Sequence, residues 1–300
     1  MNQPGTMDIF GGNSSNTSST SKTKTRHPNK LPDLTNCNLS DDKFFSVMMQ
    51  QEAFCKQILE IILDKKFTDL KFNSIQETLQ NLPGYKSIRL DAYAEDAEGN
   101  RYNIEMQKLH NDNMPKRSRF YQSLLDTSSL PQGKTVKYND MTKLYVIFIT
   151  DFDVFDRGLC RYTFTNRCHE IPTLELGDDV TKIFLNLKGV NNNIPSGLQD
   201  LLHFIKDTRS DFMSQDSRMQ TLVNLVKTLK GSEKVRTDTM NMNWVIEEAK
   251  EEAKEEGIKA LINSLQRAGM DSNFILQQLQ EEYNLTLEQA KSYMSENSSK

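Results

Sequence analysis

Two short segments with a two-residue apolar repeat, separated by a turn, constrain the fold of this chain more than any other feature. Residues 87–95 (SIRLDAYAE) and 101–107 (RYNIEMQ) alternate apolar and polar side chains, which is the period of a half-buried β-strand. Between them, residues 96–100 (DAEGN) form a turn signal. The pattern therefore predicts a β-hairpin with one apolar and one polar face. The apolar face carries Ile88, Leu90, Ala92, Ala94, Tyr102, Ile104 and Met106, and the polar face carries Arg89, Asp91, Tyr93, Glu95, Asn103, Glu105 and Gln107.

The polar face of this hairpin groups side chains that carry oxygen atoms. Glu105 and Gln107 project from the same side of one strand, about 7 Å apart. Asp91 meets Glu105 on that side if the turn holds an odd number of residues. Two carboxylates and an amide oxygen suit Mg²⁺ or Mn²⁺, and such an ion neutralises a phosphate and activates water. The competing interpretation is an ordinary solvent-exposed polar face, which is common in antiparallel sheets.

The N-terminal part of the chain divides into a polar extension and a long amphipathic helix. Residues 13–26 (NSSNTSSTSKTKTR) are almost entirely Ser, Thr, Asn and Lys. Such a segment has no apolar side chains whose burial could offset the conformational entropy lost on ordering. We therefore expect residues 1–38 to be a disordered extension. Apolar residues then recur at helical spacing over 41–64, with Ser40 as the expected cap and Asp42 in the first turn.

Beyond the hairpin, the patterns predict further helices and strands of a core domain that spans 39–230. Pro115 opens a predicted helix over 116–125. The apolar run 144–150 (LYVIFIT) predicts a strand that is buried on both faces. Shorter strand candidates lie at 162–164 and 183–185, and the apolar spacing is helical from Ser196 onward.

The segment 231–300 is predicted to be a helical tail. A charged stretch at 247–257 (EEAKEEAKEEG) is typical of a solvated helix. Two short helices follow, the last one opened by a capping box of Thr286 and Gln289. Between these features lies an apolar stripe at helical spacing, formed by Ile258, Leu261, Ile262 and Leu265. The stripe packs either on the two short helices or on a second copy of the chain, which would make a homo-oligomer.

Bulk properties narrow the class of protein. The formal net charge is -4, but residues 245–300 hold 11 Asp and Glu against 6 Lys and Arg, so the acidic bias lies in the tail. No run approaches the ~18 apolar residues that a membrane span needs, and no basic and apolar leader opens the chain. The 4 cysteines lack the paired spacing of a zinc site and suit reduced thiols. We expect a cytoplasmic protein without a membrane partner.

Several blocks of the sequence, in order, resemble one protein family. The spacing of Asp91, Glu105 and Gln107 resembles the D-x(n)-(E/D)-x-K signature of the PD-(D/E)XK nucleases, with glutamine in the place of the lysine. The surrounding blocks are similar to the Rpn family of recombination-promoting nucleases and transposases. These blocks are IRLDAYAEDAEGNRYNIEMQ, PKRSRFYQSLLD, KLYVIFITDFDVFDRGLCRYTFTNRC and LGDDVTKIFLNLKG, and the tail is similar too.

The resemblance implies a fold, a cofactor and site residues. The fold would be an α/β, restriction-endonuclease-like core, with a central mixed β-sheet flanked by helices and a helical C-terminal region. Asp91 and Glu105 would hold Mg²⁺, with Mn²⁺ as an alternative, and Gln107 would complete the catalytic set. The family itself tends to carry glutamine at this place. An amide can hydrogen-bond a water, but it cannot stabilise charge as an ammonium does.

Further residues are weaker candidates. Asp42 on the first helix is a candidate for an additional metal ligand, although acids in a first helical turn are more often dipole partners. Arg117, Arg119 and Tyr121 on the predicted second helix are candidates for contacts with DNA phosphates. The alternative for these three residues is a solvated basic face.

Three functions are consistent with the sequence. The first is a metal-dependent endonuclease that cleaves phosphodiester bonds of double-stranded DNA during recombination or transposition. The second is a catalytically degenerate relative that binds DNA or protein through the same fold, which the glutamine at 107 and the absence of a global basic bias favour. The third is a helical assembly module that associates through its tail.

Overall fold

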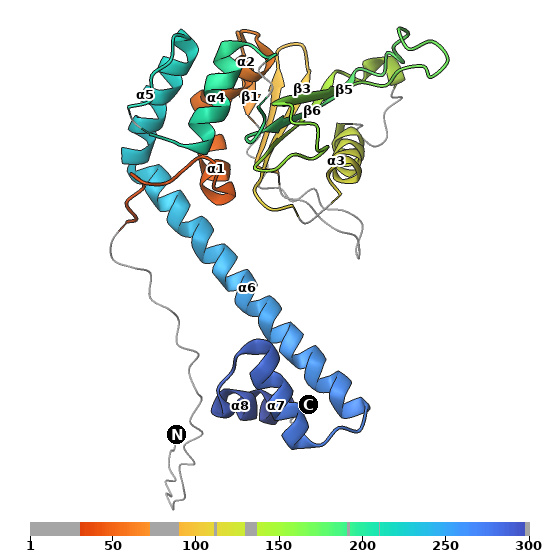
Figure 1. Cartoon of the computed structure of the whole chain (residues 1–300), viewed down its shortest axis with the longest axis vertical. Helices are drawn as coiled ribbons and strands as arrows, with labels where there is room; N and C mark the ends of the chain where they lie inside the picture. The colour runs from red at the N-terminus through yellow and green to blue at the C-terminus, as the bar shows by residue number, and fades with distance from the viewer. Residues whose placement is uncertain are drawn as a thin grey trace, which may run out of the picture. The chain divides into compact units, whose positions relative to one another are not determined.

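The computed structural model describes residues 31–72, 90–110, 113–129, 137–190, 193–209 and 211–297. Within this part of the chain the strands form one six-stranded sheet of order β1-β2-β3-β4-β6-β5 (Figure 1). Its strands are β1 (Leu70–Phe72), β2 (Ala92–Asp96), β3 (Arg101–Gln107), β4 (Leu144–Thr150), β5 (Arg161–Phe164) and β6 (Val180–Asn186). The sheet is mixed, because β3, β4 and β6 run parallel while β1–β2, β2–β3 and β5–β6 are antiparallel pairs.

Helices cover both faces of this sheet. They are α1 (Asp42–Met49), α2 (Glu52–Leu63), α3 (Met114–Ser129), α4 (Ser196–Lys206), α5 (Ser217–Gly231), α6 (Glu233–Arg267), α7 (Ser272–Tyr283) and α8 (Leu287–Asn297), with a short 3-10 helix at Tyr138–Asp140. One face packs on α1, α2, α4 and α5, and the other packs on α3 and the loop after β4 (Figure 1). The expected central mixed sheet flanked by helices is confirmed.

Strand alternation decides which core each side chain joins. Ile104 and Ile147 face the α1–α2 side, whereas Val146 and Phe148 face α3. β4 has the predicted limits and is buried over almost its whole length, because helices cover both of its faces. The expected strands at 162–164 and 183–185 are confirmed inside β5 and β6.

The hairpin has the predicted parity. Ala92 pairs with Ile104 and Glu95 with Arg101, so five residues separate the last pair. The strand begins later than expected, however, and residues 87–89 lie outside the described residues. Leu90, which precedes β2, packs in the cluster of Tyr93 rather than beside Ala92. The predicted alternation is therefore wrong at Leu90, because no ladder constrains the side chain ahead of the strand.

The single helix expected over 41–64 is two helices, α1 and α2, separated at Gln50 and Gln51. A straight helix of that length would extend about 36 Å, whereas the seven-residue strands beneath it span about 23 Å. The break keeps both helices on the same face of the sheet. The cap is also one residue later than predicted: Asp41, rather than Ser40, accepts a hydrogen bond from the Phe44 amide at 3.1 Å.

The predicted disordered extension, 1–38, is wrong for its last residues. Residues 1–30 lie outside the described residues, but the segment from Leu31 packs against the core. Leu34 is buried, the Asn38 side chain accepts a hydrogen bond from the Thr208 amide at 2.9 Å, and Arg236 donates to the Pro32 carbonyl at 2.8 Å. An apolar anchor and two polar contacts offset the ordering entropy here.

The tail confirms one of the two alternatives for its apolar stripe. Ile258 and Ile262 are fully buried with Ile275 and Leu279 of α7 in a separate small core. The capping box at Thr286 and Gln289 forms as predicted. The predicted start of the tail, residue 231, is the last residue of α5, and the first turns of α6, including Val235, still belong to the main core. Across the described residues, every helix is too short or too polar to cross a lipid bilayer.

Asp96 ties the turn that sets the register of the hairpin. Its carboxylate accepts hydrogen bonds from the amides of Glu98 and Asn100, from Tyr102 Oη at 2.8 Å and from Lys65 Nζ at 3.2 Å. Burial raises the pKa of Asp96, but the hydrogen bonds from Asn100, Tyr102 and Lys65 outweigh it and lower the pKa to about 2. The ionised carboxylate therefore stabilises the turn.

Replacing Asp96 should cost stability in a defined pH range. Because the folded pKa lies below the unfolded value of about 3.9, the stabilisation is present above pH ~4 and is lost as pH falls toward 2. We expect Asp96→Asn to lower the free energy of unfolding by about 2 kcal/mol at pH 7. Urea unfolding at pH 7 and at pH 2–3 measures this. A control, Glu98→Gln in the same turn, should change it by less than about 0.5 kcal/mol; equal losses in both variants would contradict the assignment.

Candidate active site

Asp91 and Glu105 face each other across the hairpin. Ala92 pairs with Ile104, so the residue before Ala92 lies opposite the residue after Ile104. Two hydrogen bonds lock this arrangement. The Asp91 amide donates to Glu105 Oε1 at 3.2 Å, and the Met106 amide donates to Asp91 Oδ2 at 2.9 Å. The predicted convergence of the two carboxylates is therefore present.

Helix α3 covers the centre of this face of the sheet, and Asp91, Glu95 and Gln107 at its margins are half-buried. Glu105 is 3% exposed and Asn103 is fully buried. Tyr121 of α3 donates from Oη to Glu105 Oε2 at 3.1 Å, and Arg117 donates from one guanidinium nitrogen to Gln107 Oε1 at 2.5 Å. The interpretation of the polar face as an ordinary solvated surface is wrong.

The contacts between β3 and α3 follow from the rise of the two elements. Alternate strand residues are about 6.6 Å apart, and helix residues four apart are about 6 Å apart along the axis. Two residues along β3 therefore cover about the same distance as four residues along α3, and the two elements run in opposite directions. At the other end of the strand the long Arg101 side chain departs from this spacing and donates to the Leu125 carbonyl at 2.8 Å and to Asp126 at 3.2 Å.

Hydrogen-bond donors surround the Glu105 carboxylate. Besides Tyr121 and the Asp91 amide, the Asn103 side-chain nitrogen donates to Oε1 at 2.9 Å. Asn103 also donates to the Ala92 carbonyl at 3.1 Å, while its own Oδ1 is buried without a hydrogen-bond partner. Each carboxylate oxygen of Glu105 is thus held in a fixed direction. Asn103 was not a predicted site residue, although its parity on β3 placed it beside Glu105.

Burial and mutual repulsion make the two carboxylates hard to ionise. Burial raises the pKa of Asp91 to about 6, the nearby Asp42 carboxylate adds to this, and hydrogen bonds from Met106 and Ser46 oppose it. Burial also raises the pKa of Glu105 well above its ordinary value, with a further contribution from the charge of Asp91. Shifted carboxyl groups of this kind are typical of functional sites.

A divalent cation fits this donor set. A buried pair of carboxylates that repel each other is stabilised by a positive charge between them, and oxygen donors are what Mg²⁺ and Mn²⁺ prefer. Within the described residues, no cluster of three or more His, Cys, Asp and Glu side chains is placed to hold a metal. The ion would therefore rely on Asp91 and Glu105, with water in its other positions, as Mg²⁺ commonly does.

The other predicted residues occupy different places. Asp42 lies in the first turn of α1, close enough to Asp91 to raise its pKa, but it does not join a three-carboxylate group. Tyr121 and Arg117 point into the site, and the Arg117 guanidinium also donates to Tyr121 Oη at 3.0 Å. Arg119 is exposed and lies near Lys182. The pKa of Lys182 is lowered by burial and by the charge of Arg119. The roles of Asp42 as a ligand and of the α3 residues on DNA stay predictions.

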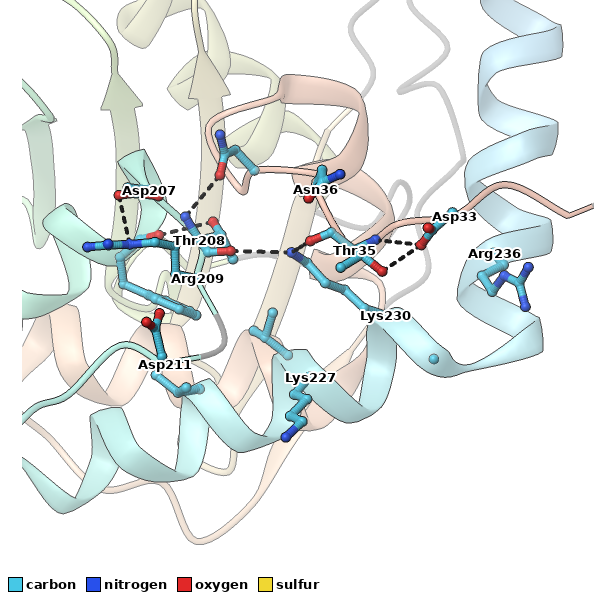
Figure 2. Close-up of a pocket in the computed structure, with 15 residues that line it drawn as sticks. Asp33, Thr35, Asn36, Asp207, Thr208, Arg209, Asp211, Lys227, Lys230 and Arg236 are labelled. Atoms are coloured by element: carbon cyan, nitrogen blue, oxygen red, sulfur yellow. Dashed lines mark hydrogen bonds and ion pairs between the residues drawn. The ribbon is translucent and has the colours of Figure 1, made fainter.

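A separate cavity of about 870 Å³ lies away from these residues. Figure 2 shows it between the N-terminal segment, the end of α4 and α5. Lys230 crosses the cavity and donates to the carbonyls of Thr35 at 3.1 Å and Thr208 at 3.4 Å. No residue of β2, β3 or α3 lines it, so it is not part of the candidate active site.

Comparison with known families agrees with the arrangement. The family model described as PD-(D/E)XK nuclease family transposase matches residues 43–299. The chain belongs to this family. The match begins in α1 and includes the hairpin, α3 and the helical tail, so the restriction-endonuclease-like fold class expected from the resemblance is confirmed. No curated protein and no solved structure matches the chain.

Because the two carboxylates of this PD-(D/E)XK protein repel each other, we expect that neutralising one of them stabilises the fold. The folded pKa of Asp91, about 6, lies above the unfolded value of about 3.9, so ionisation of Asp91 destabilises the fold as pH rises from ~4 through 6. Asp91→Asn should therefore raise the free energy of unfolding by roughly 1–3 kcal/mol at pH 8, and by little at pH 4. Urea unfolding with a metal chelator present measures this.

The control is Asp151→Asn. It removes a carboxylate that does not belong to the Asp91–Glu105 pair and that forms an ion pair with Lys188 at 3.7 Å. This variant should gain no stability at pH 8. A loss of stability in Asp91→Asn at pH 8 would contradict the assignment of Asp91 as a strained acid.

Proposed function

We propose that this protein is a Mg²⁺-dependent endonuclease, able to use Mn²⁺, that hydrolyses phosphodiester bonds of double-stranded DNA. The observation that supports it most is the pair formed by half-buried Asp91 and buried Glu105, which repel each other and whose oxygens suit a hard cation. The membership of the PD-(D/E)XK nuclease family transposases supports a nuclease function. The setting that we propose is recombination or transposition, in the cytoplasm.

A bound metal ion would supply two things to this site: neutralisation of the scissile phosphate and an attacking water of lowered pKa. Asp91 and Glu105 would hold the ion. Tyr121 and Asn103 would keep Glu105 in one orientation through their hydrogen bonds, as outer partners of metal ligands do. Gln107 stands at the edge of the pair and is half-buried, and its amide is held by Arg117 and by the Leu109 carbonyl.

The phosphate backbone needs positive charge outside the acidic pair. Arg119 is exposed on α3, and Lys182 on β6 lies close enough to Arg119 for their charges to interact. We propose that Arg119 contacts DNA phosphates. Arg117 and Tyr121 are held within the site by Gln107 and Glu105. We therefore propose that these two residues could contact only the phosphate that lies in the site.

A second candidate function is a non-cleaving member of the family that binds DNA. The observation that favours it is Gln107: both ends of its amide are used within the protein, by Arg117 and by the Leu109 carbonyl at 3.0 Å. Assembly through the tail has less support, since Ile258 and Ile262 of the stripe are buried against α7.

Cleavage of supercoiled plasmid separates the two candidates. With Mg²⁺ or Mn²⁺, the wild type should convert supercoiled plasmid to nicked and linear forms. Asp91→Ala and Glu105→Ala should each lower the rate by roughly 1000-fold or more, because each removes a charged metal ligand. Gel quantification over time gives the rates.

The matched control is Glu95→Ala, which removes a carboxylate from β2, four residues after Asp91. Its rate should stay close to that of the wild type. Cleavage that persists in both site variants would reject this site, and a wild type that binds DNA without cutting it would favour the second candidate.

A further inference from the structure

The site lacks a cation at the strand position where the family signature has lysine. Gln107 occupies that position, and an amide carries no charge. Resting on the proposed nuclease function, we propose that Arg117 of α3 supplies this positive charge and fixes the Gln107 amide, so that the arginine and the glutamine together do the work of the lysine. Arg117 is thus a positioning residue that reaches the site from the helix rather than from the strand.

The contacts of Arg117 tie it to both ends of the site. One nitrogen of its guanidinium donates to Gln107 Oε1 at 2.5 Å, and the other donates to Tyr121 Oη at 3.0 Å. Tyr121 in turn donates to Glu105 Oε2 at 3.1 Å. The guanidinium also lies 5.4 Å from the centre of the Tyr121 ring. The planar guanidinium, bonded to two fixed partners, can take only one orientation. A lysine ammonium at the same place would not be oriented in this way.

The charge of Arg117 acts on the acidic pair. It lowers the pKa of Asp91 and of Glu105, against the stronger effect of burial. The hydrogen bonds to Gln107 and Tyr121, which itself donates to Glu105, place the guanidinium one side chain away from Glu105. From there a positive charge also stabilises negative charge that develops on a phosphate held by the same carboxylates.

The hydrogen bonds orient Gln107 as well. Because Arg117 takes Oε1, the amide nitrogen must point the other way, where it donates to the Leu109 carbonyl. The orientation of the amide is thus determined by a charged donor on one side and a carbonyl on the other. Replacing Arg117 removes both the charge and the reason for this orientation.

The rise of the elements explains why the cation can come from α3. Arg117 and Tyr121 are four residues apart on one side of the helix, and they meet Gln107 and Glu105, two residues apart on β3. The guanidinium of Arg117 therefore lies at the end of the side chain of residue 107. The competing explanation is that Arg117 only holds α3 against the sheet. The two explanations differ in what they predict for metal binding.

Three variants test the proposal by plasmid cleavage. Arg117→Ala should lower kcat by about 100- to 1000-fold, the usual loss when one donor to developing charge is removed, with little change in KM. Adding Gln107→Lys to Arg117→Ala should restore at least about tenfold, because the ammonium returns to the strand position. Lys116→Ala removes a positive charge from the same turn of α3, on an exposed side chain, and should leave the rate unchanged.

Mn²⁺ affinity, measured by calorimetry on the same proteins without DNA, gives a readout that a structural role would move in the opposite direction. Removing a cation beside the carboxylates should tighten Mn²⁺ binding by about two- to tenfold, whereas misplaced ligands would weaken it. Weaker Mn²⁺ binding in Arg117→Ala, or no rescue by Gln107→Lys, overturns the proposal while cleavage by the wild type still supports the nuclease. If the wild type does not cleave, the nuclease function fails, and tighter Mn²⁺ binding in Arg117→Ala alone supports the placement of Arg117 beside the metal site.

Discussion

Two carboxylates held side by side on the hairpin determine the character of this protein. Glu105 is buried under α3 and Asp91 is half-buried beside it; they repel each other, and both have a raised pKa. Such a pair costs folding free energy unless something positive lies between or beside them. The surrounding structure supplies hydrogen bonds from Tyr121, Asn103 and backbone amides. A divalent cation would supply the missing charge, which links the stability of the fold to its proposed chemistry.

The frame that holds this pair depends on two matches of geometry. The turn tied by Asp96 keeps the hairpin in the register that places Asp91 opposite Glu105. The rise of α3 matches that of β3, so that Arg117 and Tyr121 meet alternate strand residues. Apolar residues on the other face of β3 pack on α1 and α2, which leaves β3 buried on both faces. A strand buried in this way has little freedom to slip, because a shift of one residue would exchange its faces.

Much of this arrangement was predictable from local sequence patterns, and the rest depends on contacts between distant residues. Alternation and turn chemistry predicted the hairpin and the convergence of Asp91 with Glu105, and the apolar run predicted β4. The same patterns could not show that α3 covers the polar face, because the periodicity of one strand or helix does not indicate which other element packs against it. For this reason the sequence does not single out Asn103, and it offers a DNA contact or a solvated face for Arg117 rather than its hydrogen bond to Gln107. The break at Gln50 has no Gly or Pro to mark it and follows from the size of the sheet.

Calorimetric titration of Mn²⁺ into the metal-free protein at pH 6 and pH 8 shows whether Asp91 and Glu105 form a metal site. We expect the wild type to bind more tightly at pH 8, because the two carboxyl groups must lose their protons to bind the ion. The double variant Asp91→Ala, Glu105→Ala should not bind. Undiminished binding by the double variant, or no binding by the wild type at either pH, would mean that these two residues do not form a metal site.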